Sequence, residues 1–477
     1  MTTTDDSRRW PRWAVLLLVA VAARAITFGN PIVHVDEEFY FVTARLWTEG
    51  LIPYVDVWDR KPIGLFLIYL PPAALGLPLG TWAYQAMALT SVVATAALIA
   101  RLAERAGWTR GALLGGVAYV IWLNLATGEG GQAPVFYNLL MVGAAALILP
   151  GATITRTRGM AAMTLVGLAL QVKYSAVFEG VFFGLWLLAA EWRRGRGVPP
   201  LLGYASLLVA VALLPTLLAW AAYAAIGHGG DWLYANFTSI LGRNPDPLGD
   251  QLGNLLRLVA IVAPLLALAL LARRTDAERE RARQRFLRLW LAAALAGLLA
   301  FGSWFEHYAL PLFVPATILA AGTFGDPARR RFALGLLGLA AVVGQIILVH
   351  QRSGRGTPAQ LAAIAHAIGP GPGSLWVQSG STMLYVASGR RPATRWVFPS
   401  HIGRERERGA IGTDQETELR AIVARAPAVV VMRGPYRGER KDLRALAEAL
   451  LARGGYRVTA DLPLGRERLR VFKRAPG

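Results

Sequence analysis

Long apolar runs separated by short, Arg-rich polar loops dominate the first 350 residues of the chain. Most runs come close to the ~20 residues that an α-helix needs to cross a bilayer. The pattern therefore predicts a polytopic α-helical membrane protein with about eleven transmembrane helices. The expected spans are residues 13–28, 81–101, 111–127, 133–150, 159–172, 175–191, 201–226, 254–272, 286–303, 305–322 and 331–349.

Residues 62–80 are also apolar but contain four prolines, so they predict either a broken span or a helix along the outer leaflet. If they do not cross, every short Arg-rich loop falls on one side of the membrane. Such loops remain cytoplasmic, and the basic Arg8, Arg9 and Arg12 before the first span agree with this orientation. We expect a bacterial-type plasma (inner) membrane protein with a cytoplasmic N-terminus. The two short spans around Lys173 could instead form one bent helix.

The pattern changes after residue 350, where apolar runs shorten to strand length. Residues 374–378, 428–432 and 469–472 predict strands, and 417–424 and 442–451 predict helices. We therefore divide the chain into a transmembrane catalytic domain, 1–350, with an exterior loop at 30–61 that carries the active site, and a small exterior α/β domain, 351–477.

Composition narrows the possible functions. The chain is 55% hydrophobic with a mean hydropathy of +0.41, and it has no cysteine, which removes disulfides and thiolate chemistry. Its net charge of +20 could indicate nucleic acid, but the positive-inside rule already accounts for most of the arginines in the loops, so we expect no nucleic-acid partner. Residues 351–477 hold 22 Lys and Arg against 10 Asp and Glu. This surface either attracts membrane lipids and phosphate-linked substrates or is simply solvated.

One polar stretch follows the first span directly and carries the strongest candidates for chemistry. Asp36 and Glu37 lie about eight residues after that span, and a partly desolvated carboxylate there can take a proton from a hydroxyl. The alternative is that these acids are only solvated at the interface. Asp59 and Lys61 follow, and the lysine could stabilise a departing phosphate or simply anchor a helix end.

Further candidates occur later in the chain, all on the predicted outer side. Lys173 and the adjacent Tyr174 lie between two short spans, where a cation needs an anion or a cavity. His307 and Tyr308 precede a late span, and no second histidine stands at metal-binding spacing. We predict no metal or other cofactor, although carboxylates at Asp36, Glu37 and Glu129 leave a divalent cation as an alternative.

Taken together, these motifs resemble the GT-C class of membrane glycosyltransferases, in particular the polyprenyl-phosphate-dependent protein mannosyltransferases and aminoarabinose lipid A transferases. The resemblance extends over nearly the whole chain and rests on short motifs. These are Asp36-Glu37 with the following Phe39-Tyr40, Ala44-Arg45 and Gly50; Trp58 to Pro62; Lys173-Tyr174; His307 to Pro311; and Leu384 to Pro392.

The resemblance implies a glycosyltransferase, hexosyl or pentosyl, that moves a sugar from a polyprenyl-phosphate donor to a hydroxyl of a lipid, glycan or protein on the outer face. It implies that Asp36 is the general base with Glu37 beside it. The implied donor-phosphate ligands are Lys61, Lys173, His307 and Tyr308, and the implied acceptor or supporting residues are Asp59, Glu129 and Tyr174. Many relatives carry another acid where residues 132–138 have none.

Two other classes of function remain open on the sequence. A transporter or flippase for lipid-linked or anionic substrates would carry ionisable residues near the middle of several spans, whereas here most charges lie at the outer rim. A non-catalytic assembly subunit would present the basic tail to cell-envelope polymers. Such a subunit would tolerate neutralisation of Asp36.

Overall fold

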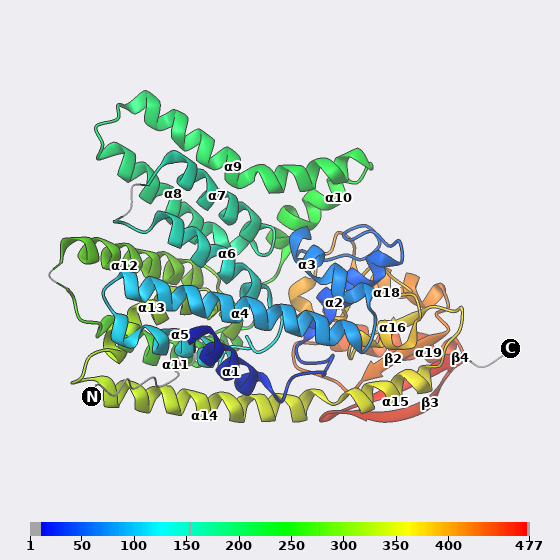
Figure 1. The fold of residues 1–477 in the computed structure, drawn as a ribbon. Helices are drawn as coiled ribbons and strands as arrows, with labels where there is room; N and C mark the ends of the chain where they lie inside the picture. Colours follow the sequence, from blue (N-terminus) through cyan, green and yellow to red (C-terminus); the bar gives the residue numbers. More distant parts are fainter. Residues whose placement is uncertain (1–10, 152–153, 276, 475–477) are drawn as a thin grey trace.

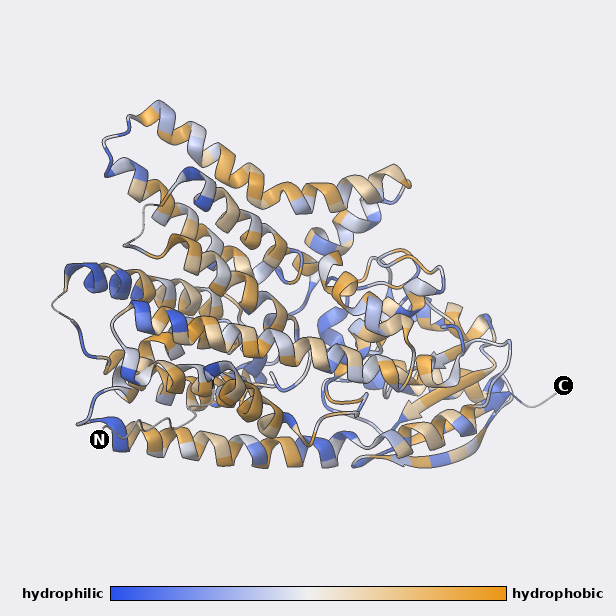
Figure 2. Ribbon diagram, in the orientation of Figure 1, coloured by the Kyte–Doolittle hydropathy of each residue, from blue (hydrophilic) through white to orange (hydrophobic). Residues whose placement is uncertain are grey.

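The computed structural model describes residues 11–151, 154–275 and 277–474. The predicted basic flank at Arg8 and Arg9 lies outside the described residues. A bundle of apolar helices occupies one part of the molecule, and a smaller body with a β-sheet lies at one end of it (Figure 1). The Arg-rich start of α12 lies at the other end (Figure 2).

Each of the eleven predicted spans coincides with a helix. These are α1 (Arg12–Arg24), α4 (Leu79–Arg105), α5 (Ala112–Leu123), α6 (Ala133–Ile148), α7 (Arg156–Leu170), α8 (Val177–Trp192), α9 (Val198–Ala225), α11 (Leu248–Leu270), α12 (Glu278–Leu299), α13 (Phe313–Phe324) and α14 (Arg330–Arg355). Among the described residues, five helical segments are long and apolar enough to cross a membrane: Leu79–Arg105, Tyr174–Trp192, Val198–Ala225, Leu248–Leu270 and Arg330–Ile368. The protein is therefore an integral membrane protein, and the count of eleven spans stays a prediction.

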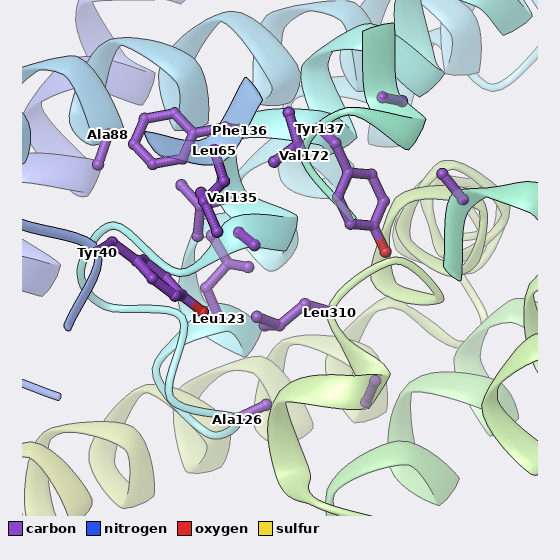
Figure 3. Packing of buried hydrophobic residues seen from close by; sticks show 14 of the residues in the cluster. Tyr40, Leu65, Ala88, Leu123, Ala126, Val135, Phe136, Tyr137, Val172 and Leu310 are labelled. Carbon is purple, nitrogen blue, oxygen red and sulfur yellow. The ribbon is translucent and has the colours of Figure 1, made fainter. Parts of the chain in front are cut away.

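Small residues set how closely the helices approach. A Cβ at Gly115 of α5 would lie 2.9 Å from the Thr317 carbonyl oxygen of α13, and one at Gly116 would lie 2.8 Å from the Ala96 carbonyl oxygen of α4. Glycine thus allows α5 to pack with its backbone against two neighbours, as is usual between membrane helices. Larger apolar side chains from α2 to α6 fill the adjoining space (Figure 3).

Lys173 separates α7 from α8, so the predicted alternative of one bent helix is wrong. Its backbone is extended, with φ −159° and ψ 127°, and a short 3₁₀ turn, η2 (Tyr174–Ala176), leads into α8. Within α8, the carboxylate of Glu179 accepts a hydrogen bond of 2.5 Å from the Trp290 indole of α12. The buried acid therefore has a partner inside the bundle.

Two short helices connect the bundle to the smaller body. Helix α2 (Val35–Thr48) is mostly buried, and α3 (Ile63–Ala74) packs against it. This packing against the buried α2 favours the prediction that residues 62–80 do not cross.

The chain after α14 forms a four-stranded mixed sheet with helices packed on it. The elements are α15 (Pro358–Ile368), β1 (Leu375–Val377), α16 (Met383–Ser388), α17 (Ser400–Gly403), α18 (Gln415–Ala424), β2 (Val429–Arg433), α19 (Lys441–Arg453), β3 (Tyr456–Leu464) and β4 (Glu467–Arg474). The strand order is β1-β2-β4-β3, and only the β1–β2 pair is parallel.

The predicted strands and helices after residue 350 lie at β1, β2, β4, α18 and α19, whereas β3 was not predicted. The predicted domain boundary at residue 350 falls inside α14, which continues to Arg355. A capping box of Thr357 and Gln360 then begins α15 almost at once. The exterior location of this α/β body stays a prediction.

Candidate active site

The N-terminus of α2 holds the first acidic motif in a fixed network. His34 is the N-cap, and its Nδ1 accepts the backbone N–H of Asp36 at 3.1 Å. The side-chain amide of Gln132, just before α6, donates to the same Nδ1 at 2.7 Å and to Oδ2 of Asp36 at 3.2 Å. Because Nδ1 accepts two hydrogen bonds, His34 is a neutral imidazole here, and its contact with Asp36 is not an ion pair.

This network leaves the Asp36 carboxylate ionised. Burial by itself raises the pKa of Asp36, but the ammonium group of Lys61 and the hydrogen bond from the Gln132 amide lower it more, so the pKa lies below its usual value. The helix N-terminus also favours a negative charge in the first turn. Asp36 is therefore available as a proton acceptor at neutral pH.

Lys61 lies opposite α2, at the end of the segment that leads into α3. Its Nζ lies 3.6 Å from the Asp59 carboxylate and 5.7 Å from the centre of the Tyr40 ring. Its backbone carbonyl accepts a hydrogen bond of 2.7 Å from the hydroxyl of Tyr54. Burial lowers the pKa of Lys61, but the carboxylates of Asp59 and Asp36 raise it above the usual value, so the ammonium group is charged.

Lys173 lines the same space from the turn between α7 and α8, which packs against the start of α3. Its Nζ lies 4.9 Å from the centre of the Tyr308 ring, within cation–π distance. The neighbouring His307 lies edge-on to His34, with ring centres 6.2 Å apart. Burial, with Lys61 nearby, lowers the pKa of Lys173 to about 8, because Asp36 compensates only in part. A bound anion beside Lys173 would raise this pKa again.

One cavity of about 1100 Å³ joins these groups. Among the predicted site residues, Asp36, Asp59, Lys61, Lys173, His307 and Tyr308 line it. Its opposite wall is apolar and comes from α5, α11 and α14. The apolar lining residues are Trp122, Leu125, Ala260, Ile261, Pro264, Leu336, Leu339, Ala340, Val343, Ile346 and Ile347. Leu339 and Ile346 are 59% and 62% exposed, so the cavity is open beside apolar side chains of α14, one of the candidate membrane spans.

Three predicted site residues do not line this cavity. Glu37 follows Asp36 on a helix, and successive helical side chains point about 100° apart, so its carboxylate faces Gly130 and Gly131 instead. Burial raises the pKa of Glu37 to about 8 and that of Glu129 to about 7. Both carboxylates are buried and neither lines the cavity, so neither is placed to contact a substrate bound in it.

Tyr174 also lies outside the cavity lining. Its hydroxyl donates to the Asn236 amide oxygen at 2.9 Å, and its ring packs on Phe237 with centres 5.1 Å apart. It therefore supports the loop after α9 and contributes no surface to the cavity. Of the predicted pair Lys173-Tyr174, only the lysine faces the site.

Sequence reasoning missed several lining residues. His34 was overlooked because a neutral helix cap carries no charge signal, and the same holds for the amide of Gln132, which contacts His34 and Asp36 from behind the lining. A group of arginines was overlooked because charged residues in loops usually only face solvent: Arg60, Arg243, Arg257, Arg355, Arg404, Arg406 and Arg433. Among the described residues, no group of three or more His, Asp or Glu side chains is arranged as a metal site.

Comparison with known proteins identifies the fold. No family model and no curated protein matches the chain. The crystal structure of ArnT from Cupriavidus metallidurans bound to undecaprenyl phosphate is similar, with a TM-score of 0.64 at 16% identity over 96% of this chain and 98% of that one. Its apo structure gives 0.65 at the same identity, over 96% and 97%.

An Archaeoglobus fulgidus oligosaccharyltransferase, tethered to an acceptor peptide, has a TM-score of 0.52 at 13% identity, over 98% of this chain and 74% of its own. Both proteins are GT-C glycosyltransferases. Identities this low establish the arrangement of the backbone and leave the substrates to be argued from the site. The structural resemblance predicted from the motifs is confirmed: the chain shares its overall fold with these two GT-C glycosyltransferases.

Proposed function

We propose that this protein is a membrane glycosyltransferase that moves a sugar from a polyprenyl-phosphate donor to a hydroxyl acceptor. One observation carries the proposal: a single cavity joins an ionised carboxylate and two buried lysines to a long apolar wall that opens toward the bilayer. Cations suit a phosphate, and an apolar wall suits a prenyl chain. The combination fits a lipid-linked sugar phosphate better than a soluble nucleotide sugar.

In the proposed reaction the acceptor oxygen attacks the anomeric carbon of the donor sugar. The bond from that carbon to the phosphate oxygen breaks, and polyprenyl phosphate leaves with the bonding electron pair. Asp36 takes the proton of the acceptor hydroxyl as the new bond forms. Attack from the face opposite to the phosphate inverts the anomeric configuration.

Lys61 and Lys173 face the negative charge that develops on the leaving phosphate. A phosphodiester donor carries one negative charge, whereas the released monoester carries up to two, so the lysines stabilise the product-like transition state more than the bound donor. The hydroxyl of Tyr308 and the imidazole of His307 lie at the same end of the cavity and can donate hydrogen bonds to phosphate oxygens.

We place this site at the outer face of a bacterial-type inner membrane, with the α/β body exterior and the Arg-rich loops cytoplasmic. The orientation rests on the loop charges, and Figure 2 supports it because the polar start of α12 lies away from the sheet. The acceptor is a lipid, glycan or protein, and its class follows from the experiment below.

The test is a transfer assay in membranes that contain the protein. Membranes are supplied with polyprenyl-phosphate sugars, each radiolabelled in the sugar, and transfer of label to lipid, glycan and protein fractions is measured. We expect label from one donor to leave the prenyl-phosphate pool, with polyprenyl phosphate released in equal amount. Movement of the intact labelled donor across the bilayer without transfer would support the flippase alternative and refute the proposal.

A further inference from the structure

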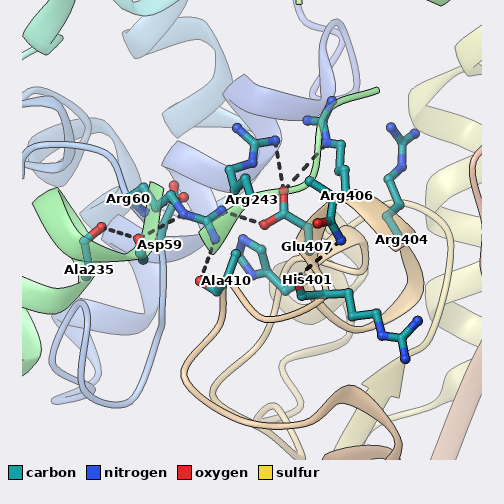
Figure 4. Close-up of polar contacts among 12 residues, drawn as sticks. Asp59, Arg60, Ala235, Arg243, His401, Arg404, Arg406, Glu407 and Ala410 are labelled. Carbon is teal, nitrogen blue, oxygen red and sulfur yellow. Dashed lines mark hydrogen bonds and ion pairs between the residues drawn. The ribbon is translucent and has the colours of Figure 1, made fainter. Parts of the chain in front are cut away.

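A buried cluster of charges joins the α/β body to the segment that carries Lys61. At its centre is Glu407, whose side chain is only 3% exposed. One carboxylate oxygen accepts from Arg60 at 2.6 Å, and the other lies 2.9 Å from the Arg243 guanidinium. Arg406 lies 3.6 Å from the same carboxylate. Figure 4 shows these three arginines around Glu407.

Arg60 uses its whole guanidinium group to hold three segments together. Besides its bond to Glu407, it donates to the Ser239 hydroxyl at 2.9 Å and to the Ala410 carbonyl at 2.7 Å. Its guanidinium also lies 4.7 Å from the centre of the Trp58 ring. Since the group has five donors in a rigid plane, these contacts fix both its position and its orientation.

Arg60 is connected to Lys61 through the backbone and through the carboxylate of Asp59. The N–H of Arg60 donates to Oδ1 of Asp59 at 2.7 Å, and Oδ2 of that carboxylate lies 3.6 Å from Nζ of Lys61. On the other side of the segment, the Trp58 N–H donates to the Arg395 carbonyl at 2.9 Å. The α/β body therefore holds the segment from Trp58 to Lys61 at two points, the Trp58 N–H and the Arg60 guanidinium.

The loop between α10 (Gly229–Leu233) and α11 is attached to the same part of the α/β body. The Asn244 N–H donates to the Arg406 carbonyl at 3.0 Å, and a Cβ at Gly242 would lie 2.7 Å from the Gly409 carbonyl oxygen. Arg243 and Glu407 both line the cavity that holds Lys61. The cluster thus forms a wall of the cavity as well as a junction.

We propose that Glu407 is a positioning residue for the donor: by holding Arg60 and Arg243 it fixes Lys61 at the place where the donor phosphate binds. The inference rests on the function proposed above. Without the negative charge of Glu407, Arg60 and Arg243 lose their carboxylate partner, and the segment 58–61 loses one of its anchors. A misplacement of about 1 Å in a group that orients substrate can cost on the order of 100-fold in rate.

The test compares two variants of the full-length protein, Glu407→Gln and Glu405→Gln. Glu405 lies two residues away and is 58% exposed, so its variant is a matched control for the loss of one negative charge. The first measurement is hydrogen exchange of the backbone amides. We expect at least tenfold faster exchange at Trp58 and Asn244 in Glu407→Gln and wild-type exchange in Glu405→Gln. Unchanged exchange in Glu407→Gln overturns the proposal, whatever the activity of the protein.

The second measurement is the transfer assay, with donor and acceptor varied separately. We expect the donor KM of Glu407→Gln to rise about tenfold while the acceptor KM stays within twofold. A merely structural role would lower the amount of active protein, which reduces the apparent kcat and leaves the donor KM unchanged, and that result would overturn the positioning role. If the wild-type protein transfers no sugar, the proposed function fails, and the exchange measurement still decides whether Glu407 holds the segment.

Discussion

Replacement of Asp36 by asparagine tests the proposed mechanism most directly. Asparagine has nearly the same shape, and its Oδ1 can still accept the hydrogen bond that Gln132 donates at 3.2 Å to the aspartate. The change therefore removes the negative charge and the basicity and keeps the local geometry. Stability should fall by the lost interaction with the N-terminus of α2, about 0.3–1 kcal/mol, and by the lost attraction between Asp36 and Lys61.

Activity should fall far more than stability. Loss of a positioned general base typically costs on the order of 10²–10⁴-fold in rate, which corresponds to about 2.7–5.4 kcal/mol of transition-state stabilisation. Donor binding should not weaken, because Asp36 repels the donor phosphate that the lysines attract. We therefore expect kcat of Asp36→Asn to drop at least 100-fold, with a donor KM equal to or below that of the wild type.

The assay is transfer of radiolabelled sugar at saturating donor and acceptor, together with thermal unfolding of the purified variant. Asp56→Asn is the matched control, since Asp56 is exposed in the same segment and does not line the cavity. Turnover of Asp36→Asn within threefold of the wild type would remove Asp36 from the chemistry. Such a result would favour the interpretation of the chain as a non-catalytic assembly subunit.

Three further predictions follow from the charges around the cavity. Because Lys173 has a pKa of about 8, its charge is lost as the pH rises through that value, so the donor KM should increase above pH 8, and Lys173→Arg should abolish this increase. Lys61→Met should raise the donor KM at least tenfold more than the acceptor KM, with Lys441→Met, outside the cavity lining, as its control; equal effects on both would argue against a phosphate contact. Glu37 has a raised pKa of about 8, so its contribution to stability is complete below pH ~4.5 and is lost as the pH rises to about 8. Glu37→Gln should therefore flatten the dependence of Tm on pH over this range, and an unchanged dependence would show that Glu37 does not titrate with unfolding.

The positions of the predicted membrane helices could be predicted because each contains a long apolar run. Strands β1 and β2 were predictable because their side chains are largely apolar, and β4 because Leu469, Val471 and Phe472 form a short apolar core within it. Strand β3 was not, since exposed polar residues such as Arg457 and Thr459 alternate along it and resemble a loop. Strand β3 lies at the edge of the sheet and pairs only with β4, so its sequence can be recognised as a strand only together with that partner.

The candidate site was only partly predictable for a different reason. The loop charges placed Asp36, Lys61 and Lys173 on the same side of the membrane, and the structure joins them in one cavity. The sequence pattern could not predict in which direction each side chain points. Glu37 points away from the cavity although it is adjacent to Asp36. The partnership of Arg60 with Glu407 spans 347 residues of sequence, and no local signal could reveal it.

The lateral opening of the cavity beside Leu339 and Ile346 has a kinetic consequence. A donor with a prenyl tail would arrive by two-dimensional diffusion within the leaflet, so the concentration that governs the rate is its mole fraction among the lipids, not its molarity in the whole sample. Added detergent or carrier lipid would then slow the enzyme by surface dilution, even at a constant total amount of donor.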